Sequence, residues 1–183
     1  MPIAFFASCA AAQAPAAPPE REQACIACHG PEGNSATPGT PSIAGQPRIY
    51  LENTLVLTRE GLRGNAVMQA LLKGVPDPEI IAIAKHYAAR PVRYHPSPPD
   101  KALQKHGAQV AGRLRCASCH DKTFRGREQM PRLAAQREEF LEARMLTLRD
   151  KPPPGTDTIM AATLYGVSNA DIKALAHFLA HLR

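Results

Sequence analysis

Two copies of a Cys-x-x-Cys-His motif stand out in this 183-residue chain, at Cys25–His29 and Cys116–His120. Two thiols at this spacing can form thioether bonds with the two vinyl groups of haem, because one helical turn presents both sulfurs to one porphyrin edge. The histidine that follows can then reach the iron from the proximal side. The motifs therefore predict two covalently attached haem c groups, held by Cys25, Cys28, Cys116 and Cys119, with His29 and His120 as axial ligands of the iron.

Other uses of a Cys-x-x-Cys pair fit the sequence less well. A zinc ribbon places its two pairs about 15 to 20 residues apart, whereas Cys28 and Cys116 lie almost ninety residues apart. A thioredoxin-like redox pair follows a strand of a βαβ unit, and no such strand pattern is visible. Disulfide bonds within the motifs would leave both histidines unexplained. Haem attachment is the hypothesis that accounts for all of these residues.

Methionine supplies the candidates for the sixth iron ligand. Met68 and Met160 each follow a motif histidine by about 40 residues, and a thioether ligand raises the reduction potential relative to a second histidine. Met130 is the alternative in the second half, but no methionine matches it in the first half. Met145 is expected to fill the core, as a methionine at helical spacing usually does.

Five further histidines are interpreted as packing or solvent-exposed residues rather than ligands. They are His86, His95, His106, His177 and His181.

The chain is an internal repeat with an offset of 90 to 92 residues. Besides the motifs, Pro41–Gln46 (PSIAGQ) matches Pro131–Gln136 (PRLAAQ), and Met68 matches Met160. The matches keep their order along the chain, which indicates duplication of one domain. The predicted organisation is a leader at 1–19, a first domain at 20–90, a proline-rich linker at 91–99 and a second domain at 100–183.

Both halves are predicted to be helical, and the fold class is all-α. Apolar residues recur at helical spacing, and no alternating strand pattern appears. Asp77 and Asn169 are the expected N-caps of the last helix in each half. The expected helices span residues 20–28, 49–59, 78–89, 100–113, 136–148 and 169–182. Aromatic residues make up only 5% of the chain and tryptophan is absent, so a large apolar cofactor would supply missing core volume.

The N-terminus resembles the remnant of a secretion signal. Ala12–Ala14 (AQA) fits a small-residue cleavage site, and Cys9 offers a weaker alternative as a lipidated cysteine. No later segment reaches 18 uninterrupted apolar residues. The net charge of +6 suits an acidic protein partner or an anionic membrane surface better than nucleic acid, for which no binding motif is present.

The residues quoted above resemble the dihaem cytochrome c4 family over residues 20–183. The Pro-x-x-Ala-Gly-Gln segment at 41–46, together with the two tandem domains, carries this likeness, since the haem motifs identify only a c-type cytochrome. The resemblance implies two class I cytochrome c domains related by approximate two-fold symmetry. It also implies His29/Met68 and His120/Met160 ligation, with Pro41 and Pro131 each presenting a carbonyl to the proximal histidine ring.

The same resemblance implies a function in the periplasm, for a protein that is soluble or peripherally associated with a membrane. The protein would be an electron carrier of the respiratory chain and not an enzyme, passing electrons from an upstream donor towards a terminal oxidase. Two alternatives remain: a cytochrome subunit of a dehydrogenase complex, and a dihaem redox enzyme of the peroxidase or thiosulfate-oxidising type. Asp121 and Ala135 replace glycines of the family pattern, so the two haem sites are expected to differ in reduction potential.

Overall fold

The structure is a computed structural model that describes residues 21–93, 97–154 and 158–183. The predicted leader, with Cys9 and the cleavage site at 12–14, lies outside the described residues. The linker histidine His95 also lies outside them.

The described residues form helices joined by loops, as predicted for an all-α fold. The first half contains α1 (Glu22–His29), a 3-10 turn (Pro31–Gly33), α2 (Arg48–Arg59), α3 (Ala66–Leu72) and α4 (Asp77–Ala88). The second half contains α5 (Lys101–Arg113), α6 (Ala117–His120), α7 (Glu138–Asp150), α8 (Thr158–Leu164) and α9 (Asn169–Ala180). None of these helices is long and apolar enough to cross a membrane.

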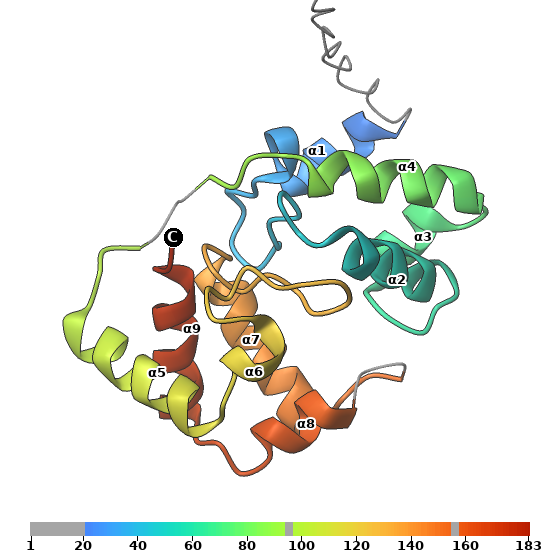
Figure 1. Ribbon diagram of the computed structural model, residues 1–183. Helices are drawn as coiled ribbons and strands as arrows, with labels where there is room; N and C mark the ends of the chain where they lie inside the picture. The colour runs from blue at the N-terminus through green and yellow to red at the C-terminus, as the bar shows by residue number, and fades with distance from the viewer. Residues whose placement is uncertain (1–20, 94–96, 155–157) are drawn as a thin grey trace, which may run out of the picture.

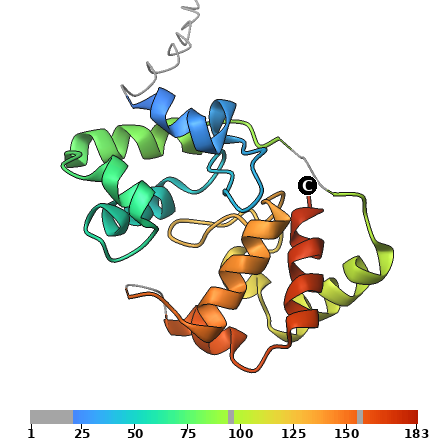
Figure 2. The same cartoon turned by 180° about the vertical axis from the view of Figure 1, so that it is seen from behind.

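The two halves form separate helical groups that meet through their loops. Figures 1 and 2 show α1–α4 on one side of the molecule and α5–α9 on the other, with loop segments of both halves between them. In the first half α2 packs on α3 and α4, and in the second half the equivalent helix α7 packs on α8 and α9, while α9 also packs on α5. The same arrangement is therefore built twice, once in each half.

The capping residues correct two details of the sequence analysis. The helix expected to start after Asp77 includes it, because the last extended residue before the helix is Pro76, which is the N-cap of α4. The N-cap of α9 is Ser168 and not Asn169, since the Ser168 side chain accepts a hydrogen bond from the Asp171 N–H. In both cases the N-cap lies one residue earlier than the sequence pattern indicated.

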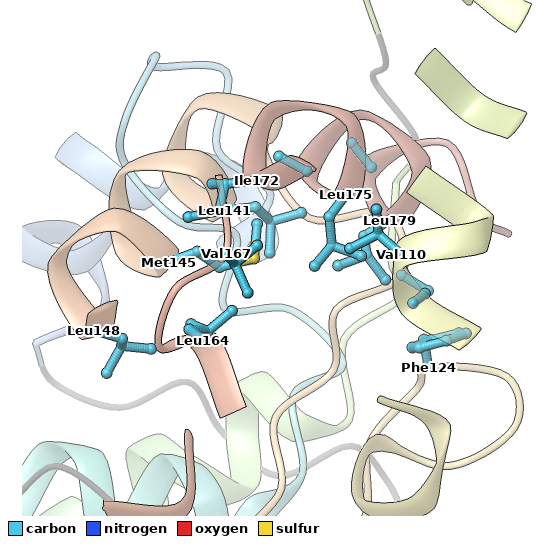
Figure 3. Close-up of a cluster of buried hydrophobic side chains, with 14 residues drawn as sticks. Val110, Phe124, Leu141, Met145, Leu148, Leu164, Val167, Ile172, Leu175 and Leu179 are labelled. Atoms are coloured by element: carbon cyan, nitrogen blue, oxygen red, sulfur yellow. The ribbon is translucent and has the colours of Figure 1, made fainter. Parts of the chain in front are cut away.

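The core of the second half is one continuous cluster of buried side chains. Figure 3 shows the labelled members, which come from α5, α7, α8, α9 and the loops between them: Val110, Phe124, Leu141, Met145, Leu148, Leu164, Val167, Ile172, Leu175 and Leu179. The first half has two smaller clusters, one around Tyr87 and one around Ile80. Met145 is core filler, as predicted.

The described ends of the linker are each attached to one half. Asn34 donates to the Pro91 carbonyl at 3.0 Å and accepts from the Arg93 N–H at 2.8 Å. On the other side, Ser97 donates to a Glu138 carboxylate oxygen at 2.7 Å. These contacts limit how far the two halves can move apart.

The crossing of α5 and α9 predicts a position that admits no side chain. A β-carbon at Gly107 would overlap the Ala174 carbonyl oxygen and the Phe178 β-carbon of α9. Gly107→Ala should therefore destabilise the holoprotein by about 1–3 kcal/mol in chemical denaturation. The matched control is Gly112→Ala on the same helix, where a β-carbon meets nothing within 4 Å and should stabilise by about 0.5–1 kcal/mol. Equal stability of the two variants would contradict this account of the helix crossing.

Candidate haem sites

The first motif occupies α1, and its histidine is the last residue of that helix. His29 is buried, and its Nδ1 lies 2.8 Å from the carbonyl oxygen of Pro41. Because a carbonyl oxygen only accepts hydrogen bonds, Nδ1 must carry the ring proton, which leaves Nε2 with a free lone pair. Cys25, half-buried, and Cys28, exposed, are free thiols one helical turn apart. The site thus offers two thiols and one neutral imidazole.

The second motif repeats this geometry at the end of α6. His120 is buried, and its Nδ1 donates to the Pro131 carbonyl at 2.9 Å. Its Nε2 is also buried and has no hydrogen-bond partner among the described residues. A buried polar atom left without a partner costs about 1–3 kcal/mol, whereas a metal bound to the lone pair would remove that cost. Cys116 and Cys119 are free thiols, so the residues present fit a covalently attached haem.

Burial keeps both imidazoles in the form that binds iron. Desolvation lowers the pKa of His29 and of His120, and the hydrogen bond to the proline carbonyl only partly opposes this effect. Both rings are therefore neutral at pH 7, as metal ligation requires.

The two departures from the family pattern preserve the local backbone. Asp121 has φ 65° where Gly30 has φ 75°, and Ala135 has φ 54° where Gly45 has φ 59°. The Asp121 side chain accepts from the backbone N–H and the hydroxyl of Thr123, which supports the left-handed conformation. Asp121 and Ala135 thus add side chains at these two turns, and the backbone keeps a positive φ at both positions.

The methionines predicted as ligands lie on two short helices that the sequence analysis did not anticipate. Met68 is on α3 and Met160 on α8, and both are partly buried. Met68 packs against the first-half cluster around Ile80, and Met160 packs against the second-half core. Met130 is also partly buried, but it lies in a loop, in a short bridge with Arg127. Met68 and Met160 therefore match across the repeat both in their spacing from the motif histidine and in their position on a short helix.

Two arginines that the sequence analysis missed hold the segments that leave these helices. Arg59, the last residue of α2, donates to the Val75 carbonyl at 2.7 Å. Arg149, near the end of α7, donates to the Val167 carbonyl at 2.6 Å. Each arginine ties the chain after a methionine-bearing helix to a longer helix. In the sequence, the one sign of these contacts is that the repeat offset relates Arg59 to Arg149 and Val75 to Val167.

The other described histidines make structural contacts, in agreement with their interpretation as packing residues. His177 donates from Nδ1 to Glu138 at 3.0 Å and accepts at Nε2 from the Asp100 N–H at 2.9 Å. His181 contacts the carbonyls of His177 and Ser97. Although Glu138, His177 and His181 lie close enough to share a metal ion, both nitrogens of His177 are already hydrogen-bonded. We therefore assign this cluster to anchoring the linker.

Comparisons with known proteins agree with the repeated geometry. The family model described as Cytochrome c matches residues 104–183. The chain is 31% identical to a thiosulfate dehydrogenase electron acceptor from Thiomonas intermedia (strain K12), over 90% of this chain and 81% of that protein. It is also 31% identical to cytochrome c4 from Thiocapsa roseopersicina, over 85% of each protein. The chain belongs to the dihaem cytochrome c4 family.

A solved structure extends this cytochrome c4 assignment to the whole fold. Reduced recombinant cytochrome c4 from Pseudomonas stutzeri superposes with a TM-score of 0.79 at 27% identity, covering 87% of this chain and 94% of that chain. The fold consists of two tandem class I cytochrome c domains related by approximate two-fold symmetry. The cofactors of this cytochrome c4 are two haem c groups, one for each domain.

The orphaned nitrogen of His120 predicts a variant that external imidazole can rescue. His120→Gly should retain both haems, because the thioethers persist, but one of the two should lose its six-coordinate low-spin spectrum. Added imidazole should restore that spectrum by entering the space left by the ring. His106→Ala, at an exposed histidine paired with Asp171, is the control and should leave the optical spectrum unchanged. An unaltered spectrum in His120→Gly would show that another group binds the iron.

Proposed function

We propose that this cytochrome c4 is a periplasmic electron carrier with two His/Met haem sites. The thioether bonds form at Cys25 and Cys28 in the first domain and at Cys116 and Cys119 in the second. The axial pairs are His29 with Met68 and His120 with Met160. The two domains extend over residues 20–90 and 100–183, with the linker between them.

The observation that carries this proposal is the mirrored arrangement of His29 and His120. Each ring is buried, each is oriented by a proline carbonyl, and each is left with a lone pair on Nε2. A bound haem iron takes up and releases one electron without consuming a substrate. The protein's contribution is to fix the ring, exclude water and limit rearrangement between the two oxidation states.

The donor and acceptor belong to the same proposal. We infer that electrons enter at one haem and leave from the other towards a terminal oxidase of the respiratory chain. The likeness to a thiosulfate dehydrogenase electron acceptor supports a dehydrogenase of a reduced sulfur compound as the upstream donor. That likeness also favours a second candidate, a cytochrome subunit bound firmly to such a dehydrogenase. Co-purification of the dehydrogenase at high salt would favour the subunit over the free carrier.

A dihaem redox enzyme would need an iron with an open or exchangeable position. The matched placement of Met68 and Met160 on short helices argues against this alternative, because it offers both irons the same sixth ligand. A spectrum that shows one five-coordinate haem in the oxidised protein would favour a dihaem redox enzyme instead.

The ligand assignment predicts a specific optical signature. Protein matured in a periplasm should contain two haems per chain and show the weak far-red sulfur-to-iron charge-transfer band at the strength of two sites. Met68→His and Met160→His should each remove half of that band, because histidine replaces the thioether. Met130→Leu is the matched control and should leave the band intact. If Met130→Leu halves the band and Met160→His does not, the second-domain ligand is Met130.

The net charge of +6 predicts electrostatic steering towards an acidic partner. The second-order rate of electron transfer to an acidic redox protein should fall as ionic strength rises from 10 mM to 300 mM, because salt screens the attraction over about 10 Å at 0.1 M. Stopped-flow kinetics with a neutral inorganic reductant provide the control, for which the rate should change little. A rate with the protein partner that is independent of salt would rule out docking through the basic surface.

A further inference from the structure

The peptide group between Pro41 and Ser42 is hydrogen-bonded on both sides. Its carbonyl oxygen accepts from His29 Nδ1 at 2.8 Å. Its N–H, which belongs to Ser42, donates to Oε1 of Gln136 in the other domain at 2.7 Å. The same glutamine donates from Nε2 to the Ser42 carbonyl at 2.9 Å. The peptide that orients the first proximal histidine is therefore held by a side chain of the second domain.

The second domain shows the same arrangement with the roles exchanged. The peptide between Pro131 and Arg132 accepts from His120 Nδ1 at 2.9 Å and donates to Gln46 Oε1 of the first domain at 2.9 Å. Gln46 also donates from Nε2 to the Arg132 carbonyl at 3.1 Å. Each glutamine thus bonds to the histidine-holding peptide of the domain to which it does not itself belong.

These contacts lie in the buried interface between the domains. Gln46, Gln136 and Ser42 are each 4% exposed, and Arg132 is 3% exposed. Hydrogen bonds in such a low-dielectric environment polarise one another, so a chain of them is stronger than isolated pairs. Each proximal histidine is therefore connected to the other domain through two buried hydrogen bonds, one to the proline carbonyl and one from the same peptide to a glutamine of the other domain.

The direction of the electronic effect follows from the resonance of the peptide group. When the N–H donates to an oxygen, more negative charge resides on the carbonyl oxygen, and that oxygen becomes a better acceptor. A stronger bond from Nδ1 makes the imidazole a more basic ligand, as groups that bond to metal-ligating histidines do. A more basic ligand favours ferric iron and lowers the reduction potential.

We propose that Gln46 and Gln136 are positioning residues that act crosswise, each lowering the reduction potential of the haem in the opposite domain. This inference rests on the proposed haem ligation by His29 and His120. It makes the docking of the domains part of each haem's environment, so that separating them would raise both potentials.

The test is a pair of mirrored variants, Gln136→Met and Gln46→Met, which keep the side-chain length and lose the amide. The two haem potentials are measured separately by NMR redox titration of the haem methyl signals, assigned with Met68→His and Met160→His. Gln136→Met should shift the equilibrium of the first-domain haem towards the reduced state by about threefold to tenfold, and Gln46→Met should do so for the second-domain haem. A tenfold change corresponds to about 59 mV.

Each variant serves as the control for the other. Equal shifts of both haem potentials in both variants would mean a general loosening of the interface and would overturn the proposal. A shift confined to the haem of the glutamine's own domain, or no shift of either potential, would overturn it as well. Gln136→Glu and Gln46→Glu keep an oxygen that accepts from the peptide N–H, and they should leave the opposite potential at or below the wild-type value. If the methionine variants do not fold, a rise of the opposite potential in the glutamate variants overturns the proposal. A wild-type spectrum without two His/Met haems would instead refute the proposed function.

Discussion

A histidine can serve as a stable iron ligand only while one ring nitrogen keeps its proton and the other points at the metal. In each domain a single carbonyl oxygen enforces this condition: Pro41 for His29 and Pro131 for His120. Proline fixes φ, and the hydrogen bonds from the Ser42 and Arg132 N–H groups to Gln136 and Gln46 restrain the remaining rotation of each peptide. The burial of both rings then removes competing water and keeps them neutral, while the buried Nε2 of His120 is left without a partner in the described structure.

Much of the surrounding structure maintains those two carbonyls in place. The N–H groups of Gly45 and Ala135 donate to the carbonyls of Tyr87 and Leu179, at the ends of the last helices of the two domains, at 2.9 and 3.2 Å. The proline segment of each domain is thereby tied to its own α4 or α9. The same segments meet each other across the interface through the two buried glutamines, so intradomain and interdomain contacts act on the same few peptides.

The sequence predicted the parts of this arrangement that depend on local chemistry or on the repeat. The two motifs, the all-α class and the core position of Met145 follow from spacing and periodicity. The short helices α3 and α8 were missed because seven residues carry too little periodic signal, and contacts distant in sequence, such as Arg59 with the Val75 carbonyl, hold them. The crossed pairing of Gln46 and Gln136 could not be predicted either, since it depends on how the two domains dock.

The peptides that orient the proximal histidines are buried within the domain interface, where the side chains of Gln46 and Gln136 bond to them. The most direct measurement is amide hydrogen exchange at Ser42 and Arg132 in the reduced, diamagnetic holoprotein, followed by NMR. We expect both amides to exchange only through global unfolding, with the same free energy of opening as the most protected amides of α4 and α9. Exchange of either amide at the rate of exposed loop residues would show that the interface opens while the domains stay folded, which would contradict a buried interface around the two proximal histidines.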